Sequence, residues 1–453
     1  MKKRWTLVVS LMLAAAMALT MVGCSAPEAE KEAATTSAQG QGGEGMATEP
    51  TQIVFWDMAW GAAESYPAIA ETTLNRYTEE VDPNVTFSYT NLPWSGWFEA
   101  FSTAVAANAA PDFATGGGYM PFQFAVSGEV ADLSWIVNEW KKEGTDTDFP
   151  EGALEYWTYK GKQVGIPWNF DPRMTVIRKD WLDEMGLSMP GSWKEMIEVG
   201  KAFRSRGSDI YGVAFGVVNG GIVGNYGTMN GGAWYDADGN ANVDTEANLS
   251  LMQFIRDMKD AGILPEGIEG YQSEDARKLF LAEKVGIING GCEELRGAMS
   301  QGLDVAVIPP METYDGGIKK YQNCTNGFMM FEQGQHKDIT LRVLKWYSEN
   351  TGECFAKGDM NPLPARTSFY EKCTNPNQQM IIKDVIPNVV PMVYPLEACP
   401  PSASSVEGQM FDQVFTQAAL TMDENGWKDT LAKLQSDLEE LVAERDQIGR
   451  AHV

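Results

Sequence analysis

Short apolar runs alternate with longer amphipathic stretches in the first quarter of the folded chain. Residues 52–56 show the apolar pattern of a buried strand, and residues 85–89 and 113–115 are predicted as the next two strands. Between them, residues 68–80 and 97–105 place apolar side chains at helical spacing. The order strand, helix, strand, helix, strand predicts a parallel sheet with helices on its faces.

A different pattern follows between residues 159 and 186. Lys160-Gly161 supplies a turn between two β-prone runs, and Pro167 and Pro172 then bracket the sequence WNFD at 168–171. Proline lacks a backbone N–H and biases the preceding residue to extended geometry, so we expect this segment to leave regular sheet as a stiffened strand. An extended run resumes at 174–178. A polar and aromatic cluster is thus predicted on a crossing between two compact regions, where a cleft would be lined.

Length and charge narrow the classes of protein that fit this pattern. A chain of 453 residues is too long for one core, so two lobes are expected. Lys+Arg number 35 against Asp+Glu 62, a formal charge of −27. So acidic a chain lacks the basic surface that nucleic acid binding requires. We expect a monomer with no nucleic acid partner.

Residues 1–23 have the features of an export signal. Positive residues at 2–4 precede an apolar run at 7–19 that is short for a permanent membrane span. The signal ends in MVGC at 21–24, which resembles the bacterial lipobox, in which the cysteine is lipidated. The alternative is an ordinary signal peptide with a chance cysteine. The polar stretch from the lipidated Cys24 to residue 50 lacks apolar periodicity and is predicted to be a disordered linker.

Histidine and cysteine usage limits the chemistry. The chain has 2 histidines and 6 cysteines, and no C-x-x-C spacing occurs. Five cysteines remain after Cys24, so at least one is unpaired. These counts argue against a zinc site and against a Ser-His-Asp or Cys-His catalytic set. No catalytic residue, metal or cofactor is predicted.

Two further motifs have a simpler explanation than the one they first suggest. Glycines 116–118 follow a predicted strand, but no Gly-Lys-Ser/Thr completes a phosphate loop, so we expect them to let the backbone approach a ligand. The sequence DADGN at 236–240 carries its glycine fourth, whereas a calcium-binding EF-hand loop needs glycine at its sixth position. We interpret it as a hairpin turn.

The order of motifs through the middle of the chain resembles a known family. GKQVGIPWNFD at 161–171 is followed by KDWLDEMGL at 179–187 and by a capped helix that starts SWKEM at 192–196. This order resembles the extracellular solute-binding proteins of ABC importers, in the carbohydrate-binding group that includes maltose-binding protein. Residues 276–290 are similar to the family's F-x-x-G-K-x-A-M segment, and LPAR at 363–366 is similar to its late L-P-x-R element.

The chain departs from the family pattern at two places. Cys292 and Glu293 stand where an aromatic residue is usual, which puts a stacking ring from that loop in doubt. The family's frequent tyrosine after the hinge is replaced by Thr175-Val176-Ile177.

The resemblance implies an α/β, two-lobed, periplasmic-binding-protein-like (type II) fold with a hinge and an interlobe ligand cleft. The first lobe would contain residues 51–168 and 304–347, with 304–310 as the return strand. The second lobe would contain 172–303 and 348–453.

Sugars suit such a cleft, because aromatic faces take C–H surfaces while carboxylate, amide and guanidinium groups bind hydroxyls. The candidate ligand-binding residues, several of them implied by the resemblance, are Trp56, Asp57, Tyr119, Trp168, Asn169, Asp171, Arg173, Asn230, Trp234, Glu293 and Arg366. The loop with Trp94 and Trp97 could face the same cleft. For each tryptophan the alternative is core packing. For Asp171 and Arg173 it is an ion pair that holds the hinge.

Three classes of protein fit these features. The resemblance implies the binding component of an ABC sugar importer, lipid-anchored on the extracytoplasmic face of the membrane, with a carbohydrate and permease subunits as partners. A secreted hydrolase needs only two carboxylates, which 62 acidic residues cannot exclude. A surface sensor on the same fold is the third class. We expect a binding protein and not an enzyme.

The lipobox generates a first prediction. Mass spectrometry of protein extracted from membranes should show cleavage before Cys24 and a lipid on that residue. Cys24→Ala should release the protein into the medium, because the apolar anchor is lost. A variant that stays in the membrane fraction as firmly as the parent would show that Cys24 is not the anchor.

Overall fold

The computed structural model describes residues 45–451 except 95, 119, 219–220, 233, 237–239, 318 and 392–405. The chain divides into two units, Met1–Gln39 and Gly40–Val453, and the fold below is that of the second unit. Cys24 and the export signal lie outside the described residues.

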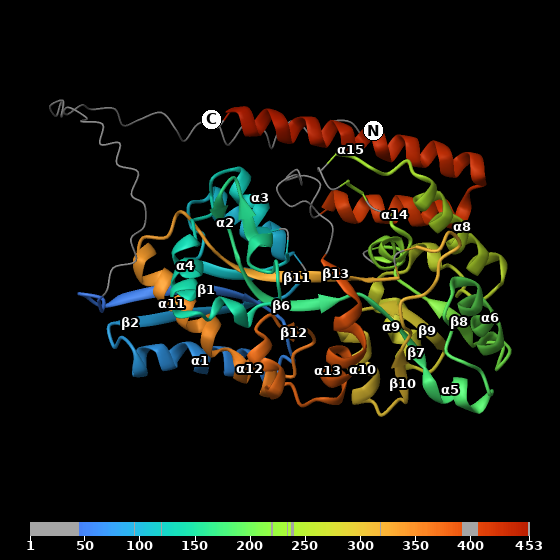
Figure 1. The fold of residues 1–453 in the computed structure, drawn as a ribbon, viewed down its shortest axis with the longest axis horizontal. Coiled ribbons are helices and arrows are strands. Elements are labelled where there is room, and N and C mark those ends of the chain that lie inside the picture. The colour runs from blue at the N-terminus through green and yellow to red at the C-terminus, as the bar shows by residue number, and fades with distance from the viewer. Residues whose placement is uncertain are drawn as a thin grey trace, which may run out of the picture. The chain divides into compact units, whose positions relative to one another are not determined.

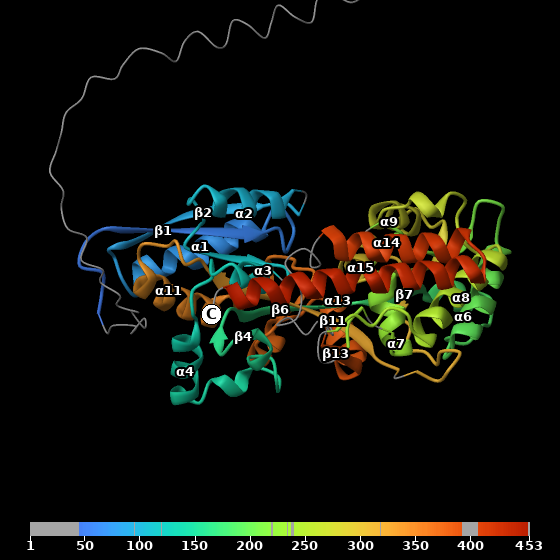
Figure 2. The ribbon, with the colours of Figure 1, turned by 90° about the horizontal axis from the view of Figure 1, so that it is seen from above.

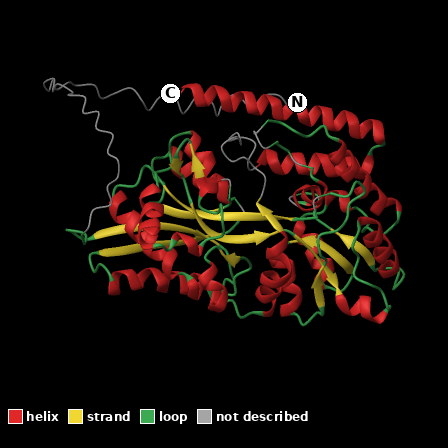
Figure 3. Ribbon diagram, viewed as in Figure 1, coloured by secondary structure: helices red, strands yellow, loops and turns green. Residues whose placement is uncertain are grey.

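The larger of two main sheets has seven strands in the order β12-β6-β11-β3-β1-β2, with β13 beside β11 (Figures 1 and 3). The strands are β1 (Thr51–Met58), β2 (Val85–Leu92), β3 (Phe113–Gly116), β6 (Ile166–Pro172), β11 (Tyr321–Met330), β12 (Leu363–Pro364) and β13 (Val389–Pro391). β1 pairs with β2 and β3 in parallel, so the predicted parallel sheet is confirmed.

Helices cover both faces of this sheet. α1 and α12 lie on one side and α2 and α3 on the other in Figure 1. Their bounds, with those of neighbouring elements, are α1 (Tyr66–Glu80), α2 (Trp97–Ala106), α3 (Met120–Val126), α4 (Ser134–Glu143), α11 (Lys337–Asn350) and α12 (Gly352–Lys357). Short turns of helix fall at Asp146–Asp148 (η1), Glu155–Trp157 (η2) and Thr367–Lys372 (η5), and the hairpin strands β4 (Thr158–Tyr159) and β5 (Lys162–Gln163) flank the predicted Lys160-Gly161 turn.

The second sheet has four strands in the order β10-β7-β9-β8. They are β7 (Met174–Arg178), β8 (Tyr211–Ala214), β9 (Val285–Gly290) and β10 (Val305–Val307). Around them lie α5 (Lys179–Glu184), α6 (Trp193–Arg204), α8 (Glu246–Asp260), α9 (Ser273–Leu281), α10 (Cys292–Ser300) and α13 (Pro376–Met380). The predicted cap of α6 is present, since Ser192 Oγ accepts from the Glu195 amide at 3.2 Å.

The crossing between the sheets stays within regular sheet, which corrects our expectation. β6 pairs with β11 on one side and β12 on the other, although it contains Pro167 and Pro172. The missing N–H of Pro167 is accommodated by a register shift between Asn326 and Gly327 on β11. β6 ends at Pro172 and β7 begins at Met174, so the chain passes directly from one sheet into the other.

The return path also differs from the expectation. Val305–Val307 pairs with β7 in the second sheet, and β11 makes the return to the first sheet. Both valines of β10 are buried there. Downstream, α12 packs on α1 and β12 pairs with β6. The predicted lobe limits at 304 and 348 stay a prediction.

The chain ends in two helices that pack on the second lobe. α14 (Val406–Thr421) contacts α8, and α15 (Glu424–Ala451) lies along α14 (Figure 2). Leu431, Leu434 and Leu438 of α15 are buried. Among the described residues, no helix combines the length and apolar character that crossing a membrane requires. The described cysteines Cys292, Cys324, Cys354 and Cys373 are free thiols.

Candidate ligand-binding site

Two sheet edges determine where a ligand would bind. β1, β2 and β3 are parallel and end together, and β8 and β9 of the second sheet do the same. In open α/β sheets, ligands bind outside the carboxyl ends of parallel strands. A site is therefore expected among the residues after these ends and at the crossing that joins the sheets.

Asp57, at the end of β1, is fully buried and engaged by other side chains. Its carboxylate accepts from Thr115 Oγ1 at 2.6 Å, Tyr66 Oη at 2.7 Å and Tyr89 Oη at 3.1 Å. Burial raises the pKa of Asp57 to about 6, against the opposing effect of these hydrogen bonds. Its neighbour Trp56 is half-buried and packs on Phe101. Both environments favour a structural role over ligand contact.

An aromatic cluster lies beyond Asp57 and consists of Trp60, Trp94, Trp97 and Phe98. The Trp60 and Trp94 rings are 4.9 Å apart at 81°, and the Trp94 and Trp97 rings are 5.9 Å apart at 80°. The Trp94 indole donates to the carbonyl of Ala59 at 3.1 Å, yet 41% of the residue is exposed. A fixed, exposed indole suits stacking on an apolar ligand face. Trp60 was not among the candidates predicted from the sequence.

Of the glycines at 116–118, Gly118 allows close packing of two backbones, and the approach of a ligand to this segment stays a prediction. A Cβ on Gly118 would lie 2.1 Å from the carbonyl oxygen of Thr325 on β11. Glycine is needed there because the backbone of β11 comes so close. Tyr119, the adjacent site candidate, lies outside the described residues.

A small polar cavity at the crossing brings three of the predicted residues together. It has a volume of about 130 Å³ and is lined by Asp171, Arg173, Ser273, Arg277, Asn289, Gly290, Gly291, Cys292, Glu293 and Glu294. Asp171 and Arg173 come from the end of β6 and the link to β7, and Glu293 comes from the first turn of α10. We call it the crossing pocket.

Hydrogen bonds fix several groups of the crossing pocket. The amide of Cys292 donates to Asp171 Oδ1 at 3.4 Å, and Arg277 pairs with Glu293 at 2.9 Å and with Glu294 at 3.0 Å. Asn289 Oδ1 accepts from Asn225 at 2.5 Å. Arg277 and Asn289 were missed by sequence reasoning, although a glycine pair directly after a strand was the available signal for Asn289.

The charges of the crossing pocket suit binding and not nucleophilic chemistry. Cys324 and the carboxyls of Asp171 and Glu294 raise the pKa of Arg173 against the effect of its burial, so its guanidinium remains charged. Burial raises the pKa of Glu293, which Arg277 partly offsets. Burial, with Asp171 nearby, raises the pKa of the Cys292 thiol well above its usual value, so no reactive thiolate forms at neutral pH. Within the described residues, no group of three His, Cys, Asp or Glu could hold a metal ion.

Trp168 and Asn169 belong to the core at the crossing. Trp168 is 3% exposed and lies between the rings of Phe328 and Phe355, each 4.9 Å away. Asn169 is fully buried, and its Oδ1 accepts from Asn326 Nδ2 at 2.8 Å. These contacts favour the packing alternative for Trp168 and leave Asn169 enclosed by the protein.

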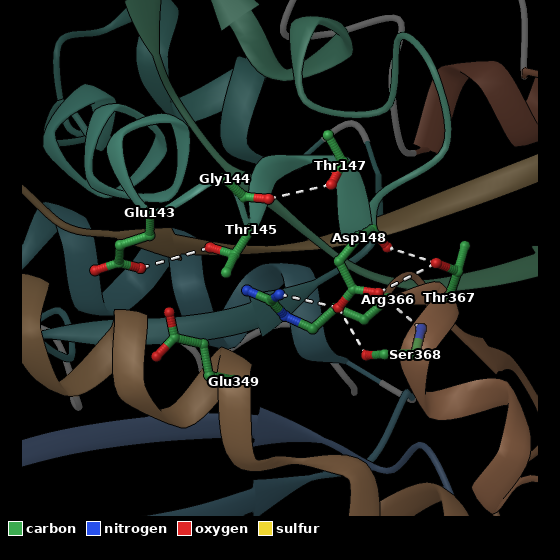
Figure 4. Close-up of a pocket in the computed structure, with 9 residues that line it drawn as sticks. All are labelled: Glu143, Gly144, Thr145, Thr147, Asp148, Glu349, Arg366, Thr367 and Ser368. Atoms are coloured by element: carbon green, nitrogen blue, oxygen red, sulfur yellow. Dashed lines mark hydrogen bonds and ion pairs between the residues drawn. The ribbon is translucent and has the colours of Figure 1, made fainter.

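Arg366 occupies a different part of the molecule (Figure 4). Its Nη1 contacts Asp148 at 3.2 Å, its Nε donates to the Ser348 carbonyl at 3.1 Å, and its guanidinium lies over Trp140 and Phe149. It lines an open groove of about 720 Å³ with Glu143, Gly144, Thr145, Thr147, Asp148, Glu349, Thr367 and Ser368. It does not line the crossing pocket, and its contacts hold η1 against η5.

Asn230 and Trp234 are also buried, in the second lobe. Trp234 is 9% exposed and meets the Phe415 ring of α14 edge-on at 5.7 Å. Asn230 Nδ2 donates to the carbonyl of Ala247 at 2.6 Å. The structure thus brings Asp171, Arg173 and Glu293 together and leaves the other described candidates in separate, mostly internal environments.

Comparisons with known proteins agree with this architecture. The sequence profile of the family described as "Bacterial extracellular solute-binding protein" matches residues 59–353. A protein of Streptomyces antibioticus named "Uncharacterized lipoprotein in oleD 5'region" is 27% identical over 171 residues, which are 37% of this chain and 36% of that protein. The match therefore spans about a third of the relative's length.

Several solved structures share the fold. A sugar transporter from Arthrobacter chlorophenolicus A6 with bound laminaribiose has a TM-score of 0.73 at 23% identity, covering 86% of this chain and 99% of that one. The GacH receptor of Streptomyces glaucescens GLA.O, studied unliganded and with acarbose, has a TM-score of 0.71 at 18% identity. The match covers 86% of this chain and 98% of that one. Maltose-bound MalE3 of T. maritima has a TM-score of 0.69 at 19% identity. The match covers 85% of this chain and 100% of that one.

The buried carboxyl of Asp57 predicts a pH-dependent stability. Its folded pKa of about 6 lies above the ordinary value of 3.8, so the native state holds the proton more tightly than the unfolded chain. The unfolding free energy should therefore fall by roughly 3 kcal/mol as pH rises from about 4 to about 6, and then level off. Urea unfolding of the parent and of Asp57→Asn measures this contribution as the difference between the two profiles. If the unfolding free energies of the parent and of Asp57→Asn changed with pH in the same way, the raised pKa of Asp57 would be contradicted.

The packing of Trp168 predicts a second stability effect. Trp168→Ala should lower the unfolding free energy by about 3–5 kcal/mol, because it opens a cavity between two core rings. Trp94→Ala is the matched control, as the same truncation at an exposed ring should lower it by only about 1 kcal/mol. Chemical denaturation in the absence of ligand gives both values. If both variants lost an equally small amount of unfolding free energy, Trp168 would have to lie at the surface of a cleft and not in the core.

Proposed function

Because this chain belongs to the bacterial extracellular solute-binding protein family, we propose that it captures a carbohydrate between its lobes for an ABC importer. The crossing pocket is the observation that carries this proposal. There, Asp171, Arg173 and Glu293 converge where the chain passes between the sheets. We further propose that the protein delivers the sugar to the permease subunits of the importer.

The chemistry of the crossing pocket supports a hydroxylated, uncharged ligand. Carboxylates accept from sugar hydroxyls, the guanidinium and amide donate to them, and charge-assisted hydrogen bonds of this kind are strong. The lining contains two cations, Arg173 and Arg277, and three anions, Asp171, Glu293 and Glu294, so no large charge excess selects an ionic ligand.

The size of the crossing pocket supports an oligosaccharide. Small-molecule sites usually enclose about 300–1,000 Å³, so about 130 Å³ accommodates only part of a ligand. We propose that the ligand extends to the aromatic cluster of Trp60, Trp94, Trp97 and Phe98. Similar structures contain laminaribiose and maltose, which makes glucose disaccharides the first ligands to try.

The anchor and location form a separate part of the proposal. The lipobox-like end of the signal and the naming of one relative as a lipoprotein support lipidation at Cys24. A lipid there would hold the protein on the extracytoplasmic face of the membrane as a monomer, close to a permease. A sensor that signals without feeding a permease would share these features and is not favoured by any contact in the site.

Glycan hydrolysis is the competing function. Glu293 has a raised pKa and shares the crossing pocket with Asp171, which is the pairing that a glycosidase needs. The ion pair between Glu293 and Arg277 works against it, because a general acid must hold its proton at neutral pH. We propose binding without turnover.

The proposal predicts ligand-dependent stability and closure. A thermal-shift screen against glucose disaccharides and longer glycans should raise the melting temperature for a subset, because the ligand binds only the native state. Small-angle scattering with that glycan should show a smaller radius of gyration, since a ligand touching both lobes favours the closed form. Unchanged scattering at saturation would remove closure from the mechanism, and release of reducing ends would favour the hydrolase.

The same prediction extends to single residues. Asp171→Asn should weaken the binding of the glycan by about 1.5–3 kcal/mol, because a charge-assisted hydrogen bond is lost. Trp94→Ala should weaken the binding of the glycan by roughly 1–3 kcal/mol, because a stacking ring is lost. The magnitude is taken by analogy from the stacking of bases on aromatic rings. Ser368→Ala, in the groove beside Arg366, is the control and should leave affinity unchanged. If only the control loses affinity, the site lies at that groove instead.

A further inference from the structure

A second cavity lies on the crossing strands and is separate from the crossing pocket. It has a volume of about 290 Å³, with Phe170 of β6 and Asn323 and Thr325 of β11 at its base. Phe170 and Thr325 are directly paired across the two strands. Its other lining residues are Pro150, Glu151, Gly152, Ala153, Tyr156, Tyr370, Ile386 and Val389. We call it the rear cavity.

The rear cavity and the crossing pocket use consecutive residues of one strand. Phe170 lines the rear cavity and Asp171 lines the crossing pocket. Successive side chains of a strand point to opposite faces, so the two cavities lie on opposite faces of the crossing. An occupant of the rear cavity is therefore distinct from a ligand of the crossing pocket.

One polar group at the base of the rear cavity lacks a partner. Asn323 is 7% exposed, and its Oδ1 accepts no hydrogen bond from the described residues. A buried acceptor without a donor is unfavourable, and proteins keep such groups where a ligand or an ordered water supplies the donor. Because Asn323 lines the cavity, a donor that satisfies Oδ1 can enter from it.

The remaining lining defines the chemistry of the occupant. Three rings, Tyr156, Phe170 and Tyr370, stand with the aliphatic side chains of Ile386 and Val389 around the space. Glu151 is the one charged residue in the lining and is exposed. An anion is disfavoured by this carboxylate. A sugar would bury hydroxyls against apolar walls, which is unfavourable without partners.

We propose that the rear cavity binds one compact, uncharged aromatic molecule that carries a hydroxyl or N–H donor, such as a phenol or an indole. The ring packs among Tyr156, Phe170 and Tyr370, and the donor points to Asn323 Oδ1. A volume of about 290 Å³ is close to the lower end of small-molecule sites and fits a single ring system. This assignment does not depend on the carbohydrate proposal.

Calorimetric titration of the purified protein with phenol, indole, benzoate and glucose tests the ligand class. Phenol and indole should bind, while benzoate should bind at least tenfold more weakly because its charge is not matched. Glucose should not compete with phenol. No heat or saturable signal with phenol or indole at millimolar concentration would overturn the proposal and leave a cavity that holds water only.

Two variants test the location and the polar contact. Ala153→Trp should abolish phenol binding by filling the space, whereas Ala107→Trp, at the exposed end of α2, should leave it unchanged. Asn323→Leu removes the acceptor while keeping the branched shape of the side chain. It should weaken the binding of phenol by about tenfold without weakening the binding of toluene. Asn388→Leu, outside the lining, is its control. Phenol affinity that survives Ala153→Trp in a folded protein would contradict the site.

Soaking a crystal of the parent protein with 4-iodophenol tests the site without any variant. The iodine signal should lie in the rear cavity, with the phenol oxygen within hydrogen-bond distance of Asn323 Oδ1. An iodine site elsewhere, or none, would overturn the proposal even if the filled variant failed to fold.

Discussion

The structure depends on the direct passage of the chain from a strand of the first sheet to a strand of the second. β6 ends at Pro172 and β7 begins at Met174, so Arg173 alone separates a strand of the first sheet from a strand of the second. The Arg173 amide donates to the carbonyl of Gln322 at 2.8 Å, which extends the pairing with β11 to this point. Because the link is so short, residues at either side of it lie close to both sheets. The crossing pocket exists because this constraint brings Asp171 and Arg173 to the first turn of α10.

Several polar candidate residues are held in place by partners from distant parts of the chain. Asp57 is surrounded by hydroxyls from α1, β2 and β3. The Oδ1 of Asn169 on β6 accepts a hydrogen bond from an asparagine on β11. Arg277 likewise holds Glu293, while the oriented Trp94 indole keeps an open face. Preorganised groups lose little entropy when a ligand binds.

The sequence by itself determined the local elements and the path of the chain. Apolar spacing predicted the parallel strands and the capped helix α6, and the motif order at 161–196 indicated the crossing and the family. Local patterns carry this information because strands and helices depend on neighbours in sequence. The prolines misled only in part: they marked the crossing, but the register shift on β11 let the segment remain in the sheet.

Only the tertiary structure decided what each candidate side chain contacts. Trp168 and Trp94 are the same residue type in similarly polar surroundings of the sequence, yet one lies between two core rings and the other is 41% exposed. Arg366 meets Asp148, which is 218 positions away. Such partners are set by how the sheets pair and how the chain returns, so residue type and spacing cannot reveal them. The sequence therefore determined where a site could form, and the pairing of distant strands determined which side chains form it.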